Sequence, residues 1–179
     1  MRYNSQEYVD VYNRCGEFPS IHDYIFNVAS TISNASALNA ADLGASTGLL
    51  TIRLRKVFKS VTGYEASDDA IQRSVSAAKL KKFKITPLSL KEFEKELLPY
   101  DIIIARRVFP ELYDAKVVFD LPEIFFRTGI KYILLEGRKP VARPSNPLWS
   151  ADLEAKVFEN FYRVIKVEGE VRLLEVRTQ

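Results

Sequence analysis

The heptapeptide DLGASTG, from Asp42 to Gly48, joins a pattern typical of a β-strand over 38–44 to a pattern typical of an α-helix over 47–58. Glycines at both ends of the turn permit positive φ angles and let a ligand approach the backbone closely. Two interpretations of this strand–turn–helix are open. It contains G-x-S-x-G, the nucleophile elbow of serine hydrolases, and it also has the form of a turn that admits a nucleotide.

The rest of the chain repeats the strand–helix alternation. Two helices are expected first, over 5–15 and 20–32. Further strands are expected over 60–66, 84–90, 100–107 and 130–137, and further helices over 67–83, 90–98, 113–129 and 150–161. Pro122 interrupts the helical segment 113–129 and Gly129 closes it. Residues 162–177 alternate in the strand period about Glu168-Gly169, which predicts a hairpin.

This alternation predicts an α/β fold, with a doubly wound, mostly parallel sheet, helices on both faces and right-handed crossovers. The closing hairpin adds an antiparallel strand, which a plain dinucleotide-binding sheet does not need. We expect a single domain over 1–179, made of an N-terminal helical segment (1–38) and an α/β core (39–179).

The composition narrows the class of protein. The 179 residues are 47% hydrophobic, enough for a substantial core, and the net charge of +3 is modest for a dedicated nucleic-acid binder. Cys15 is alone, so an intrachain disulfide and a cysteine metal cluster are excluded. The N-terminus has no apolar signal-peptide core, and the apolar runs are too short to span a membrane. We therefore expect a cytoplasmic protein with no bound metal and no membrane partner.

The two interpretations of the turn make different demands on other residues. As a nucleophile, Ser46 needs a general base that follows it in the chain, but the lone histidine, His22, precedes it in a pattern typical of an amphipathic helix. A nucleotide site instead needs an acidic residue at the end of the second strand, to accept hydrogen bonds from ribose hydroxyls. Glu65 stands there, 21 residues after Gly44. The sequence favours the nucleotide site.

At this point the chain resembles the class I S-adenosylmethionine-dependent methyltransferases. The stretch ADLGASTG is similar to their first motif, GYEAS to the second and PYDIIIARRVF to the fourth, and the closing hairpin is similar to their last two strands. The resemblance covers nearly the whole chain, with weak motifs in the right order. Ser46 stands where many members have a third glycine, and Ser89 falls where many have an acidic residue against the adenine.

The resemblance implies a set of contacts with S-adenosyl-L-methionine. Asp42 would orient the turn or reach the methionine amino group, Glu65 would hold the ribose, and Ala66 would flank the adenine. The full set of implied cofactor residues is Asp42, Gly44, Ala45, Ser46, Gly48, Glu65, Ala66, Ser89 and Ala105.

The methyl acceptor is less well marked. The sulfonium is already activated, so alignment supplies much of the catalysis and few residues are obligatory. The fourth strand lacks the N-P-P-Y motif of base-amine methylation, and no cysteine lies near the site. Glu111 is a candidate base and Arg106 a candidate catalytic residue. Arg106, Arg107 and Arg138 follow two neighbouring strands and are expected to bind the substrate, an anionic small molecule or RNA.

The sequence thus predicts an S-adenosylmethionine-dependent methyltransferase with an undetermined acceptor. A non-catalytic cofactor-binding or partner protein within a larger assembly is the alternative, because no catalytic signature is present. A nicotinamide-dependent oxidoreductase is the third interpretation, disfavoured by the terminal hairpin and the incomplete G-x-G-x-x-G.

Overall fold

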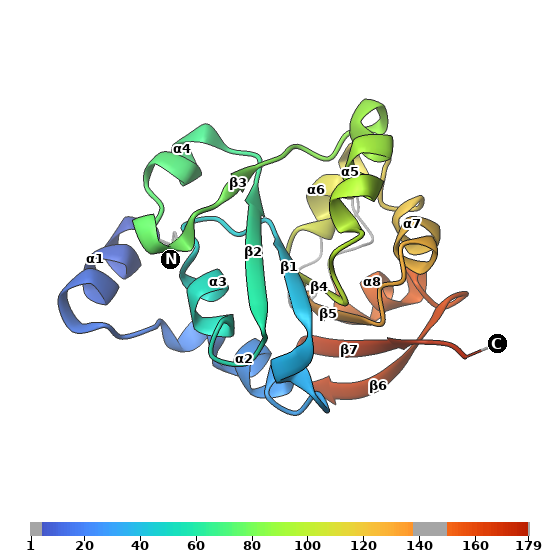
Figure 1. Ribbon diagram of the computed structural model, residues 1–179, viewed down its shortest axis with the longest axis horizontal. Coiled ribbons are helices and arrows are strands. Elements are labelled where there is room, and N and C mark those ends of the chain that lie inside the picture. Colours follow the sequence, from blue (N-terminus) through green and yellow to red (C-terminus); the bar gives the residue numbers. More distant parts are fainter. Residues whose placement is uncertain (1–4, 138–149, 179) are drawn as a thin grey trace.

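The computed structural model describes residues 5–137 and 150–178, and a seven-stranded sheet runs through it (Figure 1). The strand order is β3-β2-β1-β4-β5-β7-β6. The strands are β1 (Asn39–Leu43), β2 (Ser60–Glu65), β3 (Lys81–Lys82), β4 (Ile102–Arg106), β5 (Tyr132–Glu136), β6 (Tyr162–Glu168) and β7 (Val171–Val176). The first five are parallel, while β7 is antiparallel to both β5 and β6. The predicted fold class, including the closing hairpin, is confirmed.

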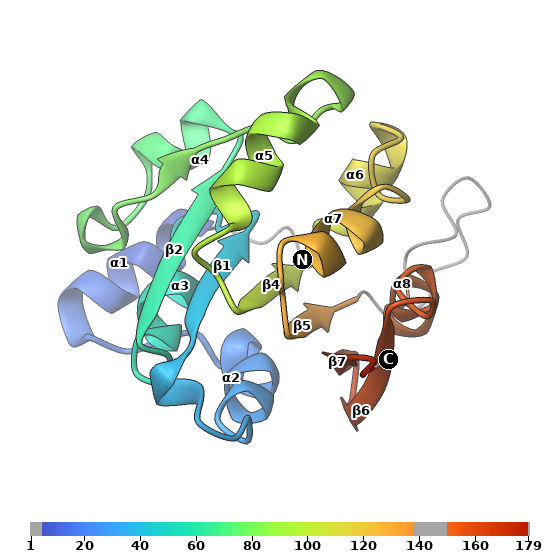
Figure 2. The ribbon, with the colours of Figure 1, turned by 45° about the vertical axis from the view of Figure 1, so that its right-hand side comes forward.

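Helices cover both faces of the sheet, as Figures 1 and 2 show. One face is covered by α2 (Asp23–Ala29) and α3 (Leu49–Leu54), and α1 (Ser5–Cys15) packs beside α3. The other face is covered by α5 (Leu90–Leu97), α7 (Leu121–Arg127) and α8 (Ala151–Val157). Two short helices, α4 (Asp68–Gln72) and α6 (Phe109–Asp114), follow β2 and β4.

The central strand β4 explains why the sheet needs both layers. Ile102 and Ile104 pack into the layer of α2 and α3, while Ile103 and Ala105 pack into the opposite layer. All four side chains are fully buried. Because successive side chains of a strand point to opposite faces, a continuous apolar run requires cover on both sides. The sequence predicted this run to be a buried parallel strand, and the structure confirms it.

The region between β2 and α5 differs from the prediction. The helix expected over 67–83 ends at Gln72, and a 3₁₀ turn (Ser76–Ala78) precedes β3. Val75 and Ala78 turn inward and are buried, and the Val75 N–H donates to the Thr47 carbonyl. Contacts with the glycine turn therefore override the local helical pattern.

The strand expected over 84–90 is also wrong, because β3 lies before it and the 3₁₀ turn Pro87–Ser89 replaces it. Pro87 has no N–H for a strand ladder. Thr86 and Ser89 instead form a reciprocal capping box.

The helical segment expected over 113–129 consists of two helices. The first, α6, already begins at Phe109, and α7 begins at Leu121, so Pro122 lies in the first turn of α7 rather than in a helix interior. Gly129 closes α7 with φ of 82°, as expected. The helix expected over 20–32 begins as a 3₁₀ turn (Ser20–His22) and continues as α2. Within 5–137 and 150–178, no helix combines the length and apolar character needed to cross a bilayer.

Candidate functional site

A cleft of about 540 Å³ opens at the carboxyl ends of the central parallel strands. The chain order reverses between β1 and β4, so this edge is the switch point at which open α/β sheets bind ligands. The volume lies within the range of small-molecule sites. The cleft is lined by Leu43, Gly44, Ser46, Tyr64, Glu65, Ala66, Ser67, Ala70, Phe83, Lys84, Ile85, Arg106, Arg107, Val108, Glu111, Leu112 and Ala115.

The turn after β1 forms the floor of the cleft and depends on left-handed backbone. Gly44 and Gly48 have φ of 70° and 79°, and Ser46, in place of a third glycine, has φ of 53°. A Cβ added at Gly44 would lie 2.9 Å from Val108 Cγ2, and one at Gly48 would lie 2.2 Å from Ala78 Cβ. Gly44 is therefore needed for the close approach of the segment after β4, and Gly48 for the approach of the 3₁₀ turn before β3.

The Glu65 carboxylate, at the end of β2, holds three backbone N–H groups. Its Oε2 accepts from the Ser46 N–H at 2.7 Å, and its Oε1 accepts from those of Ala66 and Ser67, each at 2.8 Å. The carboxylate therefore links the glycine turn to the segment that enters α4. Each carboxylate oxygen has two lone pairs, so Oε2 retains the capacity to accept a hydroxyl from a ligand.

Asp42, at the end of β1, is the buried acid of the site. Its side chain is only 1% exposed, and Oδ2 accepts a hydrogen bond of 2.6 Å from the Thr51 hydroxyl on α3. Burial raises the pKa of Asp42 to about 7, although the Thr51 hydrogen bond and the Arg106 charge act to lower it. Near neutral pH this carboxyl group is poised to take up or release a proton.

A second, smaller space lies between the N-terminal helices and the glycine turn, and we call it the chamber. Its volume is about 50 Å³, and it is lined by Tyr8, His22, Asp42, Gly44, Ala45, Ser46, Thr47, Leu49, Leu50 and Arg106. Gly44, Ser46 and Arg106 also line the cleft. These three residues therefore border both spaces.

Two arginines share one buried carboxylate where β4 and β5 end. Arg106 Nε lies 3.0 Å from Glu136 Oε2, and Arg107 Nη2 lies 3.0 Å from Glu136 Oε1. The Glu136 side chain, at the end of β5, is 7% exposed. Arg107 has a left-handed φ of 59°, and its N–H donates to the Glu136 carbonyl. Both guanidinium groups are thus anchored through β5 rather than free in solvent.

The structure brings most of the residues expected from sequence to one edge. Those that line the cleft are Gly44, Ser46, Glu65, Ala66, Arg106, Arg107 and Glu111, and Asp42 and Ala45 line the chamber. Gly48 packs against the 3₁₀ turn, and Ala105 is buried in the core. Ser89 lines neither space; its hydroxyl donates to the Lys84 carbonyl, and it forms the capping box with Thr86. Arg138, like Lys139 and Arg143, lies outside the described residues.

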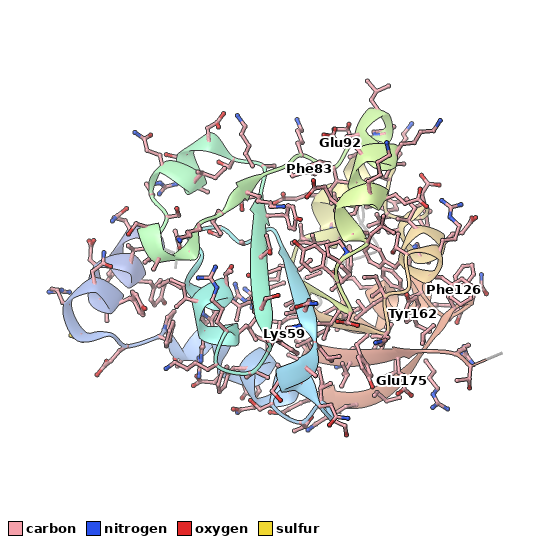
Figure 3. The ribbon with its side chains drawn as sticks, in the orientation of Figure 1. Lys59, Phe83, Glu92, Phe126, Tyr162 and Glu175 are labelled. Carbon is pink, nitrogen blue, oxygen red and sulfur yellow. The ribbon has the colours of Figure 1, made fainter. Side chains whose placement is uncertain are left out.

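The apolar wall of the cleft was not foreseen. Phe83, labelled in Figure 3, follows β3 and makes edge and tilted ring contacts with Tyr64 and Phe93. Ile85 and Leu112 also line the cleft. These residues come from segments whose secondary structure was predicted wrongly, or from a helix that begins earlier than expected. Their position at the cleft could therefore not be predicted from the sequence. The pairing of Tyr64 with Lys81 and of Glu65 with Lys82 brings Phe83 here.

Comparison with solved structures identifies the fold. NodS, an N-methyltransferase from Bradyrhizobium japonicum WM9, was solved with S-adenosyl-L-homocysteine; it matches with a TM-score of 0.64 and 12% identity over 97% of this chain and 100% of its own. The magnesium protoporphyrin IX methyltransferase ChlM from Synechocystis PCC 6803 was solved with S-adenosylmethionine. It matches with a TM-score of 0.58 and 14% identity over 99% of this chain and 86% of its own.

Monomeric WbdD matches with a TM-score of 0.53 and 17% identity over 96% of this chain, which spans 39% of the WbdD chain. No protein-family model matches the sequence, and no curated protein is similar to it in sequence. The chain therefore has the class I methyltransferase fold, with its cleft at the switch point of that fold.

Proposed function

We propose that this protein binds S-adenosyl-L-methionine in the cleft and transfers its methyl group to an acceptor. The observation that supports this most is Glu65, a carboxylate at the end of β2 that borders an open cleft and is fixed by three backbone N–H groups. A carboxylate in this place suits a ribose diol.

The other lining residues fit the same ligand. Gly44 lines the cleft and has no side chain, so a ligand can approach its backbone closely. Phe83, Ile85 and Leu112 offer an apolar wall for a purine ring. When bound, S-adenosylmethionine supplies an activated methyl group. The protein's part is to orient the donor and acceptor and to exclude water, since a positioned reaction needs little further chemistry.

The acceptor side is proposed to face Arg106, Arg107 and Glu111, and Arg138 in the segment that follows β5. Glu111 is exposed at the cleft and is the candidate base for an acceptor that must lose a proton. The arginines suit an acceptor with an anionic group, either a small molecule or RNA. A cytoplasmic location remains part of this proposal.

A non-catalytic binding or partner protein is the second candidate. The ion pairs of Arg106 and Arg107 with Glu136 favour it, because arginines with a structural role are expected to be paired with carboxylates. On this alternative the cofactor binds but no methyl group is transferred.

Two measurements test these proposals. Calorimetry with S-adenosylmethionine, S-adenosylhomocysteine and NAD should give binding of the first two and none of the third; binding of NAD alone would refute the cofactor assignment. Incubation with methyl-labelled S-adenosylmethionine and separate small-molecule and RNA fractions should then label one fraction. Cofactor binding without labelling of either would favour the non-catalytic alternative.

A further inference from the structure

The strand β6 forms one edge of the sheet, as Figures 1 and 2 show. Its inner side pairs with β7, and no other described strand pairs with its outer side. Three apolar side chains of β6 are exposed, Val164 and Ile165 at 45% each and Val167 at 60%. An edge strand offers unpaired backbone N–H and C=O groups, and exposed apolar residues on it favour pairing with another strand.

The exposed valines of β6 lie on the face of the sheet that α8 covers. Val164 lies opposite Leu174, which packs in the layer of α8. Val167 lies opposite Arg172, which forms an ion pair with Asp152 of α8. Because directly opposite residues of an antiparallel pair share a face, both valines lie on the α8 face.

The charged side chains of β6 lie on the opposite face, towards α2, because they pair with the other alternate residues of β7. They are Arg163, Lys166 and Glu168. A lysine on an edge strand commonly keeps a second strand away. Here Lys166 Nζ donates to Thr31 Oγ1, in the chain that follows α2, at 3.1 Å. Its charge is therefore directed towards α2 rather than past the edge.

The ladder between β6 and β7 shows which backbone groups face the open edge. The Val176 N–H donates to the carbonyl of the residue before β5, so the backbone of Val176 faces β5. Since this direction alternates along a strand, Leu174 and Arg172 also face β5. Their partners in β6, Val164 and Val167, then turn their N–H and C=O groups towards the open edge.

A β-bulge makes this arrangement possible. Val164 and Val167 are three residues apart, and in a regular strand their backbone groups would point in opposite directions. Ile165 is the extra residue between Val164 and Lys166 in the ladder, and it gives the two valines the same direction. Two outward-facing valines thus lie on either side of Ile165 and Lys166.

The stretch RVIKVE, from Arg163 to Glu168, is self-complementary when two copies run antiparallel. With the two-fold axis at the bulge, Val164 faces Val167 of the second copy, and their outward backbone groups can exchange hydrogen bonds. Arg163 then faces Glu168 of the second copy on the α2 face, and symmetry repeats both contacts. Opposite charges directly across a strand pair stabilise it, and the valines of both copies form one apolar patch on the α8 face.

We propose that β6 pairs antiparallel with β6 of a second copy of this chain, which joins the two seven-stranded sheets into one. Arg163 can take part because its guanidinium has five N–H donors, one of which binds Glu175 of the same chain at 2.8 Å. None of the residues that line the cleft belongs to β6 or β7. The interface is therefore separate from the cleft, and the inference does not rest on the proposed function.

Sedimentation velocity over a range of protein concentrations tests the interface. The wild type should form a dimer whose fraction rises with concentration. Val167→Lys should abolish the dimer, because it places two ammonium groups in the apolar patch. Arg163→Glu and Glu168→Arg should each raise the dimer dissociation constant about tenfold or more, because each replaces two attractive contacts by repulsive ones. Lys91→Glu, the same charge reversal on an exposed residue of α5, should leave the dissociation constant unchanged.

A mixture of the two charge-reversal variants tests the two-fold register itself. In a mixed dimer, one chain has two acidic residues and the other two basic residues at these positions, so both cross-strand contacts are attractive again. An equimolar mixture of Arg163→Glu and Glu168→Arg should therefore restore the dimer that each variant forms poorly alone. Circular dichroism and thermal unfolding of each variant check that it is folded.

Three results would overturn the proposal. A wild type that stays monomeric up to its highest soluble concentration shows that β6 does not pair with itself. A dimer that Val167→Lys and both charge reversals retain lies on another surface. Charge-reversal variants that are monomeric and stay so after mixing exclude the pairing of Arg163 with Glu168. None of these results depends on methyl transfer, so each differs from a failure of the proposed function.

Discussion

Asp42→Asn should stabilise the protein at pH 8 much more than at pH 5. The Asp42 carboxyl group is buried and its pKa is raised from 3.8 to about 7. As the pH rises through this window, the unfolded chain releases the proton first, and the folded state loses stability until Asp42 itself ionises. Asparagine stays neutral, and its side-chain oxygen can accept the Thr51 hydroxyl as the carboxylate does.

The size of the effect follows from the two pKa values. At about 1.4 kcal/mol per pKa unit, the ionised Asp42 side chain costs roughly 4 kcal/mol above pH 7, and about 1.7 kcal/mol of this is already present at pH 5. The advantage of Asp42→Asn over wild type should therefore grow by roughly 2–3 kcal/mol between pH 5 and pH 8. Urea denaturation of both proteins at the two pH values measures it.

Two features make this comparison specific. His22 has a lowered pKa, so it contributes stability that grows as the pH rises towards 6.5, but this contribution is present in both proteins and cancels. Asp101→Asn gives a control of opposite sign. Burial acts to raise the Asp101 pKa, but the Asn39 N–H and the Lys131 ammonium outweigh it and hold the pKa low. An equal advantage of Asp42→Asn at pH 5 and pH 8 would refute the raised pKa of Asp42.

The glycine turn and Glu65 can be tested separately. Glu65→Gln should weaken S-adenosylhomocysteine binding in calorimetry by about 10- to 150-fold, or roughly 1.5–3 kcal/mol; unchanged affinity would remove Glu65 from the site. Ser46→Ala should keep the fold and most of the affinity, and the wild type should resist fluorophosphonate labelling; stoichiometric labelling at Ser46 would restore the hydrolase interpretation. Gly48→Ala should cost roughly 2–5 kcal/mol of unfolding free energy, because its Cβ meets Ala78 at 2.2 Å. Gly169→Ala, with φ of 56° but open space around it, should cost only about 1–2 kcal/mol, and equal losses would contradict the steric account.

The central strands could be predicted from the sequence, because a continuous run of apolar residues indicates burial on both faces. The isoleucines of β4 leave no polar face, and such a run fits only a strand covered on both sides. The strand β3 was not predictable in the same way. It consists of Lys81 and Lys82, and only pairing with Tyr64 and Glu65 makes it a strand.

The candidate site, like the sheet, has one part that could be predicted from the sequence and one part that could not. Glu65 was found by its distance from Gly44, since the spacing reflects one strand–helix–strand unit. The chamber could not be found, because His22 and Arg106 are far apart in the chain and meet only through tertiary packing. His22 was expected to be an ordinary histidine of a helix surface or core, and nothing in its local pattern indicates that its Nδ1 lacks a hydrogen-bond partner among the described residues. Residues that carry no local signal and meet only in the folded chain can be recognised as one site only from the three-dimensional structure.

The hydrogen bonds of the glycine turn also bear on which nucleotides the turn can bind. The N–H groups of Gly44 and Ala45 donate to the Tyr64 carbonyl, that of Gly48 to the Ala45 carbonyl, and that of Ser46 to Glu65. In phosphate-binding turns such N–H groups point at the anion. Here a built-in carboxylate takes the Ser46 donor, and an entering diphosphate would meet negative charge instead of free N–H groups. We therefore expect the turn to disfavour a ligand that places phosphate groups against it, and ATP at saturating concentration should not compete with S-adenosylhomocysteine.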